Sequence, residues 1–372
     1  MTMDDKDRLW IEEQSRATGF DLAGVASVPT EGSVTERESS RRFADWVAAG
    51  RAGEMNWLKR LSSSGDLLRG DLKRSMPWAR SVIVCAMNYN VDQPKSIDSA
   101  AAGSGWIARY AWSGREAYAA SAYRGSDYHD VLLPRLRQIE SNLRQRFGDA
   151  MESRCYVDTG PIVEREYAQR AGIGWIGKNT CVLNESLGSW LLLGAIVTSL
   201  ELGPDALAVA AADRCGSCTR CIDACPTQAL IAPRMMNASR CISYLTIEKK
   251  GAIDEPLRAR MGRHVFGCDI CQDVCPWNSR APVAASGALP AREELVNPAL
   301  EWLGSMDGPQ FNRTFRGSPV ERTGRKRMQR NVAIAMGNSG DESFVPKLRE
   351  WAAGEEPVLA DAAQWALDRL KQ

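Results

Sequence analysis

Cysteine spacing is the feature of this sequence that points most directly to chemistry. Eight of the eleven cysteines lie between residues 215 and 275. A first run reads Cys-x2-Cys-x2-Cys-x3-Cys-Pro, and a second reads Cys-x2-Cys-x3-Cys-Pro with one cysteine upstream of it. The eight residues are Cys215, Cys218, Cys221, Cys225, Cys241, Cys268, Cys271 and Cys275. This spacing is typical of chains that bind two [4Fe–4S] clusters and handle electrons.

The two runs also predict which cysteines share a cluster. Thiolates two residues apart on a turning backbone can reach neighbouring irons of one cubane. In two-cluster ferredoxins, the cysteine that precedes proline ligates the other cluster. One predicted cluster is therefore held by Cys215, Cys218, Cys221 and Cys275. The other is held by Cys225, Cys241, Cys268 and Cys271.

Zinc is the alternative metal, because Cys-x2-Cys pairs also read as zinc sites. A repeated run of this length does not suit a single tetrahedral ion, so the spacing favours iron–sulfur clusters. Among the remaining cysteines, Cys85 lies in an apolar run and is expected to be a buried strand residue. The sequence leaves the roles of Cys155 and Cys181 open.

Composition sets broad limits on the class of protein. The chain has 372 residues, enough for two or three domains, and its net charge of +1 says nothing about partners. No run approaches the roughly 18 apolar residues that span a bilayer, and no export signal precedes the first expected helix. Because cluster ligands need a reducing compartment, we expect a cytoplasmic protein. No interface stripe is evident, so we expect a monomer.

Hydrophobic patterning divides the chain into three expected regions. Residues 1–205 alternate apolar strands with amphipathic helices, which predicts a layered α/β domain. Strands are expected at 20–28, 81–89, 154–158 and 190–199, and the main helix at 127–147. Residues 206–285 contain few large apolar side chains, so metal ligands are expected to organise a ferredoxin-like domain there. Residues 291–372 have helical spacing that resembles HEAT-type repeats, which should dock on the rest of the chain.

A run of basic residues lies in the helical region. Seven arginines or lysines and one glutamate fall between residues 313 and 330. Charge runs are common on solvated surfaces, but in a chain of neutral overall charge this run also suggests a surface that contacts phosphates. The candidate contacts are Arg313, Arg316, Arg322, Arg325, Lys326, Arg327 and Arg330.

A second polar group follows the strand expected at residues 154–158. Asp158 ends this strand, which is a frequent address of site residues in α/β folds, although Asp-Thr-Gly-Pro is also good turn chemistry. Glu164 and Arg165 are expected as helix-surface or ion-pair residues. The glycines at 172, 174 and 177 serve either close packing or the approach of the backbone to a large planar ligand. These residues alone identify no reaction.

The chain resembles the epoxyqueuosine reductases, cobalamin-dependent iron–sulfur enzymes of queuosine synthesis in tRNA. The resemblance runs in order along nearly the whole chain. Matching segments are Arg-Tyr-Ala at 109–111, Asp-Tyr-His at 127–129, residues 156–165, Gly-Trp-Ile-Gly-Lys-Asn-Thr at 174–180, residues 187–190, both cysteine runs, residues 240–248 and 264–278, and the helical tail. One departure is the stretch from Trp112 to Ser126, which is longer than in the family and is expected to be a surface loop.

The resemblance implies the reduction of epoxyqueuosine to queuosine at the wobble position of tRNA. It implies an α/β domain like that of reductive dehalogenases, which binds cobalamin base-off, and two clusters fed by an external low-potential donor. By family analogy Asp158 is the proton donor, and desolvation beside the corrin and the substrate favours its protonated form. The tRNA is expected to lie across the basic run and the tail. Residues expected near the corrin are Arg69, Arg109, Tyr110, Gly177, Lys178, Asn179 and Thr180.

Two other classes of protein share part of this pattern. A reductive dehalogenase also has cobalamin and clusters, but it is normally exported and has no use for a basic helical tail. A non-catalytic electron-transfer protein with eight irons needs neither Asp158 nor a cobalamin pocket. Cobalt binding therefore distinguishes this second class from the enzymes.

Overall fold

The computed structural model describes residues 1–30, 32–113, 127–203, 208–285 and 287–371. Most of the stretch from Trp112 to Ser126, namely residues 114–126, lies outside these described residues. The strands are β1 (Thr2–Met3), β2 (Leu22–Ser27), β3 (Ser81–Asn88), β4 (Trp106–Ile107), β5 (Ser153–Tyr156), β6 (Trp175–Ile176), β7 (Val182–Leu183), β8 (Leu191–Thr198), β9 (Glu201–Leu202), β10 (Leu230–Ala232), β11 (Met235–Met236) and β12 (His264–Phe266). The helices are α1 (Asp5–Ala17), α2 (Val34–Ala48), α3 (Leu72–Ser75), α4 (Tyr128–Phe147), α5 (Glu164–Arg170), α6 (Arg220–Asp223), α7 (Ile242–Ile247), α8 (Glu255–Arg258), α9 (Ile270–Asp273), α10 (Leu300–Ser305), α11 (Gly308–Phe315), α12 (Gly324–Gly337), α13 (Val345–Ala352) and α14 (Pro357–Leu370).

Four strands form the main sheet of the N-terminal region, in the order β2-β3-β8-β5. Each of the four corresponds to a strand expected from an apolar run, and all three strand pairs are antiparallel. β3 is buried at all eight of its residues. A strand is buried in this way when layers cover both faces of its sheet.

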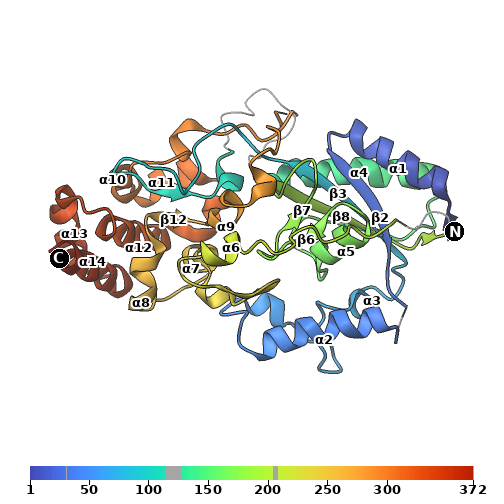
Figure 1. Ribbon diagram of the computed structural model, residues 1–372, viewed down its shortest axis with the longest axis horizontal. Coiled ribbons are helices and arrows are strands. Elements are labelled where there is room, and N and C mark those ends of the chain that lie inside the picture. Colours follow the sequence, from blue (N-terminus) through green and yellow to red (C-terminus); the bar gives the residue numbers. More distant parts are fainter. Residues whose placement is uncertain (31, 114–126, 204–207, 286, 372) are drawn as a thin grey trace.

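Helices cover the two faces of this sheet (Figure 1). On one face, α1 and α4 contribute Ile11 and Leu136, which pack with Ile83 of β3. On the other face, Met76 beside α3 and Ala168 of α5 pack in a core with β3 and β8. Alternate side chains of β3 therefore pack into the two cores on opposite faces of the sheet. This confirms the layered α/β arrangement expected for this region.

The long helix α4 confirms the amphipathic pattern at residues 127–147. Asp127 is its N-cap, and the carboxylate of Asp127 accepts a hydrogen bond from the backbone N–H of His129 at 3.0 Å. One stripe of the helix is buried against the sheet: Val131, Leu132, Leu136, Ile139 and Leu143. The N-terminus of α4 is thereby fixed at the edge of the sheet.

The cysteine-rich region and the C-terminal helices share one hydrophobic core. α7 and β12 contact α12, and Ile242, Phe266 and Val332 are among the residues buried together there. β12 also pairs in parallel with β4, which joins the N-terminal region to this core. The tail therefore docks on the rest of the chain, as expected of so short a helical unit. Its assignment to a HEAT-type repeat stays a prediction.

Arg330 of α12 joins the tail to the segment between Leu245 and Gly251 through buried hydrogen bonds. The residue is 1% exposed. Its Nη1 donates to the carbonyls of Lys249 at 2.8 Å and Gly251 at 2.6 Å. Its Nη2 donates to the carbonyl of Leu245 at 2.6 Å, and both Nη2 and Nε donate to Asn331 Oδ1. All five N–H groups of the guanidinium are thus used within the chain, which corrects the expectation that Arg330 contacts tRNA phosphates.

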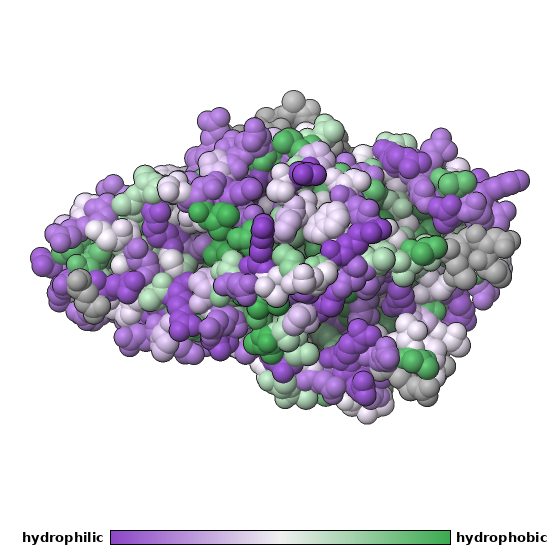
Figure 2. All heavy atoms as spheres, in the orientation of Figure 1, coloured by the Kyte–Doolittle hydropathy of each residue, from purple (hydrophilic) through white to green (hydrophobic). Residues whose placement is uncertain are grey.

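Hydrophilic residues cover most of the molecular face seen in Figure 2, and the apolar residues on that face form small separate groups. Exposed apolar side chains such as Val34 and Val209 come from segments far apart in the sequence. Among the residues that the structure describes, no helix combines the length and the apolar character needed to cross a bilayer.

We expect Arg330→Met to lower the free energy of unfolding by about 3 kcal/mol, because it leaves buried carbonyls without donors. The matched control is Arg313→Met, since Arg313 is exposed on α11 and exposed substitutions usually change stability by less than about 0.5 kcal/mol. Urea unfolding under anaerobic conditions, followed by circular dichroism, compares the two variants. Equal midpoints for both would show that Arg330 does not hold the tail.

Candidate active site and cluster ligands

The first predicted set of cluster ligands is brought together in the structure. Burial and, after it, the charges of three other thiols raise the pKa of the Cys221 thiol to about 11. Those three are Cys275, Cys215 and Cys218, the remaining members of the predicted first cluster. Cys275 and Cys215 also pack in one small core with Trp175. Cys275 thus joins the first run although it belongs to the second.

The second set of predicted ligands is also brought together. Burial raises the pKa of Cys268, and the charges of Cys241 and Cys225 act in the same direction. The charges of Cys268 and Cys241 likewise contribute to the raised pKa of Cys271. α6 and α9, which carry one cysteine from each run, contact each other, and all eight thiols are free of disulfides.

The described residues contain no three His, Cys, Asp or Glu side chains placed to hold a single metal ion. A cubane presents four separate irons, so its thiolates need not meet at one point. Two groups of four disulfide-free cysteines, of which Cys275 is buried and the other seven are half-buried, therefore fit two cubanes.

Part of the Gly-Trp-Ile-Gly-Lys-Asn-Thr segment lies against the first cysteine group. Trp175 of β6 is 1% exposed, and its indole Nε1–H donates to Cys215 Sγ at 3.4 Å. Lys178 Nζ donates to the carbonyls of Gly216 at 2.7 Å and Cys218 at 2.9 Å. Lys178 was expected near the corrin, whereas in the structure its ammonium group binds the loop of the first cysteine run.

The end of the same segment lies against the second cysteine group. Asn179 is buried, and its Nδ2 donates to the carbonyl of Cys271 at 3.3 Å. Its Oδ1 accepts from the backbone N–H of Cys181 at 3.2 Å. Thr180 has a φ of 70°, in the left-handed region. A Cβ at Gly177 would lie 2.4 Å from a side-chain carbon of β7, so glycine there lets β6 and β7 pack.

Asp158 lies two residues beyond β5, at the edge of the main sheet. It is exposed and has a φ of 54°, a conformation that costs energy and is often found at functional sites. The hydroxyl of Tyr128, the first residue of α4, donates to Asp158 Oδ2 at 3.2 Å. Burial, and then the charge of Asp158, raise the pKa of Tyr128, so the phenol keeps its proton and remains a donor. The Tyr128 ring stacks on His129, with centroids 4.1 Å apart.

Glu164, the first residue of α5, was expected as a helix-surface or ion-pair residue, and the structure shows it as an ion-pair residue with 13% of its side chain exposed. Burial, and then the charge of Asp158, raise the pKa of Glu164 from its ordinary value of 4.5 to about 7. Its Oε2 lies 3.7 Å from Arg69 Nη1, and its Oε1 has no hydrogen-bond partner among the described residues. Arg69 also donates to the carbonyls of Gly160 and Ile162. Arg69 therefore holds the loop that follows Asp158.

Tyr110 connects the acid to the second cysteine group. Its ring meets the Tyr128 ring edge-on, with centroids 5.9 Å apart. On its other side it packs on Phe266 at 6.0 Å, two residues before the second cysteine run. The backbone N–H of Arg109 donates to Asp269 Oδ2 at 2.6 Å, inside that run. A continuous path of contacts thus runs from the predicted second cluster through Tyr110 and Tyr128 to the acid.

The side chain of Arg109 lies in the protein interior. It is 5% exposed, and its guanidinium carbon lies 4.9 Å from the ring centroid of Trp112 and 4.7 Å from that of Trp190. Its Nη1 donates to Asn90 Oδ1 and to the carbonyl of Val91. These contacts favour a structural role for Arg109, which was expected to contact the corrin.

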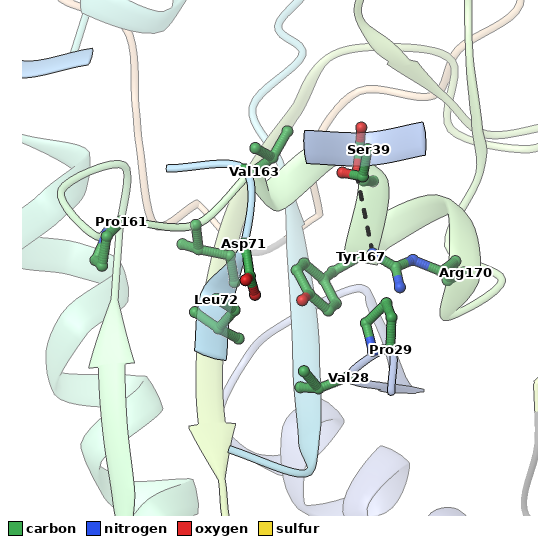
Figure 3. Close-up of a pocket in the computed structure, with 12 residues that line it drawn as sticks. Val28, Pro29, Ser39, Asp71, Leu72, Pro161, Val163, Tyr167 and Arg170 are labelled. Atoms are coloured by element: carbon green, nitrogen blue, oxygen red, sulfur yellow. Dashed lines mark hydrogen bonds and ion pairs between the residues drawn. The ribbon is translucent and has the colours of Figure 1, made fainter. Parts of the chain in front are cut away.

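A pocket borders the loop that follows Asp158 (Figure 3). It is lined by Pro161 of that loop, by Ser39 of α2, and by Tyr167 and Arg170 of α5. The Ser39 hydroxyl bonds to Glu166, and Glu166 in turn lies 3.9 Å from Arg170. The polar groups of this pocket pair with one another. They are therefore less available for hydrogen bonds to a ligand than the exposed carboxylate of Asp158 is.

The predicted phosphate contacts divide into exposed and engaged residues. Arg327 donates at 2.6 Å to each of three carbonyls and is held in place. Arg322 is exposed and pairs with Glu248 at 2.7 Å. Its guanidinium carbon lies 5.9 Å from the ring centroid of Trp57, and that of Arg69 lies 5.2 Å from the same centroid, so the basic run reaches the residue that holds the loop after Asp158. Apart from Arg327, the residues of this run that are exposed or half-exposed are Arg313, Arg316, Arg322, Arg325 and Lys326.

Three residues of these sites were not predicted from the sequence as site residues. Tyr128 lies inside the Asp-Tyr-His segment of the resemblance, and this was the signal available for it. Glu164 is the second-last residue of the matching segment 156–165, but nothing in the sequence indicates that it packs against Arg69. Trp175 sits in the most specific matching motif, yet nothing in the spacing indicates that its indole reaches a cysteine sulfur.

Comparisons with known proteins cover nearly the whole chain. The family model described as "Epoxyqueuosine reductase QueG, DUF1730" matches residues 69–159, and that of the "4Fe-4S double cluster binding domain" matches residues 214–278. The epoxyqueuosine reductase of Xanthomonas campestris is 36% identical over 358 residues, which are 96% of this chain and 94% of the relative. That of Synechocystis is 38% identical over 312 residues, covering 83% and 98%.

Solved structures agree with these relatives. An epoxyqueuosine reductase crystallised with an epoxyqueuosine-modified tRNA-Tyr stem loop superposes with a TM-score of 0.82 at 28% identity, covering 99% of this chain and 91% of that one. The Bacillus subtilis enzyme, with its catalytic aspartate loop swung out of the active site, gives 0.81 at 27% identity, covering 98% and 90%. By its sequence and its fold, this chain belongs to the epoxyqueuosine reductase family.

Proposed function

We propose that this protein reduces epoxyqueuosine in tRNA to queuosine, with Asp158 as the proton donor. The observation that carries the proposal is the path of contacts from the second cysteine group through Tyr110 and Tyr128 to Asp158. The reaction consumes two electrons and two protons and turns an epoxide into an alkene and water. A site that joins an electron supply to an acid suits this reaction, and an electron-transfer protein has no need of the acid.

The proposal assigns one task to each region of the chain. Residues 1–205 would bind cobalamin and the modified base, as the α/β domain of a reductive dehalogenase binds its cofactor. Residues 206–285 would hold two [4Fe–4S] clusters that pass electrons from an external donor. Residues 291–372 would bind tRNA. A tRNA substrate and oxygen-sensitive cluster ligands favour a protein that works in the cytoplasm. We also propose that it is a monomer, because the sequence has no evident interface stripe.

Cobalamin is the cofactor that the resemblance implies. The unpartnered Glu164 Oε1 fits an amide N–H of the kind that lines the rim of a corrin, and Tyr110 and Thr180 are the residues that would hold the ring. His129 pairs with Asp127 at 2.5 Å, and His264 is buried in β12 with its Nδ1 bonded to the Met261 carbonyl. Neither histidine is therefore placed as a cobalt ligand, and base-off binding is what the resemblance implies. Bound here, cobalamin would supply the cobalt chemistry that breaks the carbon–oxygen bonds of the epoxide.

Opening the epoxide develops charge on its oxygen, and Asp158 would protonate that oxygen. The hydroxyl of Tyr128 orients the carboxyl group through its hydrogen bond to Oδ2. Exposure of Asp158 leaves it accessible to a base that arrives on tRNA. The catalytic aspartate loop of the Bacillus subtilis relative, captured away from its active site, supports a role for a loop of this kind.

The exposed basic residues of α11 and α12 would contact the phosphates of the tRNA. The relative that was crystallised with a modified stem loop supports an RNA substrate. Arg322 shares the Trp57 ring with Arg69, which holds the loop after Asp158, so bound RNA would present its anticodon loop to the acid.

We expect Asp158→Asn to lower the rate of queuosine formation by about 100-fold or more, because an amide cannot donate the proton that the epoxide oxygen needs. The matched control is Asp149→Asn, an exposed position beyond the end of α4. Nucleoside analysis of tRNA after single turnovers measures the rate, with iron and cobalt contents checked in both variants. Equal rates in the two variants would remove Asp158 from the mechanism.

We expect the double variant Arg316→Gln, Lys326→Gln to bind tRNA more weakly and with a smaller dependence on salt. Each phosphate contact contributes about 0.7 to 0.9 to the slope of log affinity against log salt concentration. Lys371→Gln, near the end of the tail, is the control for loss of a surface charge. Filter binding over a range of salt concentrations separates the outcomes, since an unchanged slope means that RNA does not lie on this surface.

We expect Glu164→Gln to flatten the dependence of stability on pH. The raised pKa means that the folded protein keeps a proton here that the unfolded chain releases above pH 4.5. The stability from this proton is complete below that pH and is lost as the pH rises through about 7, by at most about 1.4 kcal/mol per pH unit. Urea unfolding between pH 6 and pH 8 compares wild type with Glu164→Gln and with the exposed control Glu293→Gln. A wild-type decline that persists in Glu164→Gln would assign the effect to another group.

A further inference from the structure

One short segment touches both cysteine groups. We propose that the hairpin of β6 and β7 sets the reduction potential of the first predicted cluster by placing the indole N–H of Trp175 and the ammonium group of Lys178 against its cysteine run. The proposal rests on the clusters of the proposed function and goes beyond it, because it gives Trp175 and Lys178 the role of positioning and tuning residues for one metal centre.

Trp175 serves the first cluster. Its indole N–H donates to Cys215 Sγ at 3.4 Å, and the same ring lies in a small buried core with Cys275. These two cysteines come from different runs and belong to the same predicted cluster. Trp277 meets the indole edge-on at 5.0 Å and helps to bury it. An N–H group that points at a cluster sulfur stabilises the added negative charge of the reduced state, which raises the potential.

Lys178 adds positive charge on the same side. Its ammonium group is bonded to the carbonyls of Gly216 and Cys218, between two ligands of that cluster. A cation held this close favours the more negative, reduced form. The first cluster therefore receives a hydrogen bond and a charge from a single hairpin.

The second cysteine group has a different contact with this segment. Asn179 Nδ2 donates to the Cys271 carbonyl, and Asn179 Oδ1 accepts from the backbone N–H of Cys181. These two bonds hold backbone and do not involve a cysteine sulfur. The hairpin therefore acts mainly on the potential of the first cluster.

The difference between the potentials of the two clusters decides which one holds a single electron at equilibrium. The second cluster is the one nearer to Tyr110 and the acid. Removing the indole donor lowers the potential of the first cluster and therefore shifts the electron toward the reaction site.

The first test removes the indole donor and keeps an aromatic ring. In Trp175→Phe, anaerobic redox titration followed by electron paramagnetic resonance should show one of the two reduction steps at a more negative potential. The expected fall in the equilibrium constant for reduction is about tenfold, which is about 59 mV for a one-electron couple. Trp277→Phe changes packing against the same core and keeps the indole donor of Trp175, so both steps should stay near their wild-type potentials.

The second test removes the charge. Lys178→Met should move the same reduction step to a more negative potential, whereas Lys178→Arg retains a cation and should restore most of the wild-type value. A purely structural role for Lys178 would give the same result for Met and Arg. Iron contents equal to wild type in all variants make these comparisons valid.

The outcomes separate this inference from the function itself. Wild-type protein without clusters overturns the proposed function, whereas intact clusters whose potentials do not respond to Trp175→Phe and Lys178→Met overturn only the tuning role. Should Trp175→Phe lose iron, electron–nuclear double resonance of the reduced Trp277→Phe protein, labelled with nitrogen-15 in its indole groups, decides the matter. Coupling of an indole nitrogen to one cluster supports the inference, and the absence of such coupling overturns it.

Discussion

The convergence of eight thiolates from two separate runs is the constraint on which the rest of this molecule depends. Cys275 of the second run must reach the first group, and Cys225 of the first run must reach the second group. The chain between them therefore has to leave and return, and α6 and α9 are brought into contact as it does so. A region with few large apolar side chains acquires its order from this crossing of ligands and from the neighbours that surround it.

Buried arginines stabilise segments of irregular backbone that apolar packing alone does not hold. Arg330 gathers carbonyls from the segment between Leu245 and Gly251, so a chain that lacks regular structure there still has its acceptors satisfied. Arg69 performs the same task for the loop after Asp158. In both places a planar cation with several fixed donors replaces a ladder of backbone hydrogen bonds. The protein thereby keeps irregular backbone rigid next to the sites that need it.

Much of the fold could be predicted because its signals are local. The four main strands and the buried stripe of α4 follow from runs and periods that a single segment contains, and ligand spacing indicates the pairing of the cysteine runs. What could not be predicted depends on which segments meet. Glu164 looks like a helix-surface residue until Asp158 and Arg69 are placed beside it. Arg330 looks like the other arginines of its run until the carbonyls around it are seen. Lys178 and Asn179 lie in a motif whose partners are more than thirty residues away.

On the proposed function, the core shared by the cysteine-rich region and the tail would join metal binding to RNA recognition. α7 begins directly after Cys241 and β12 ends just before Cys268, and both contact α12, on which Lys326 is exposed. Ligation at those two cysteines would fix the layer on which the basic helix rests. A molecule without its iron would then bind RNA more weakly, so that only a protein ready to deliver electrons would hold its substrate well.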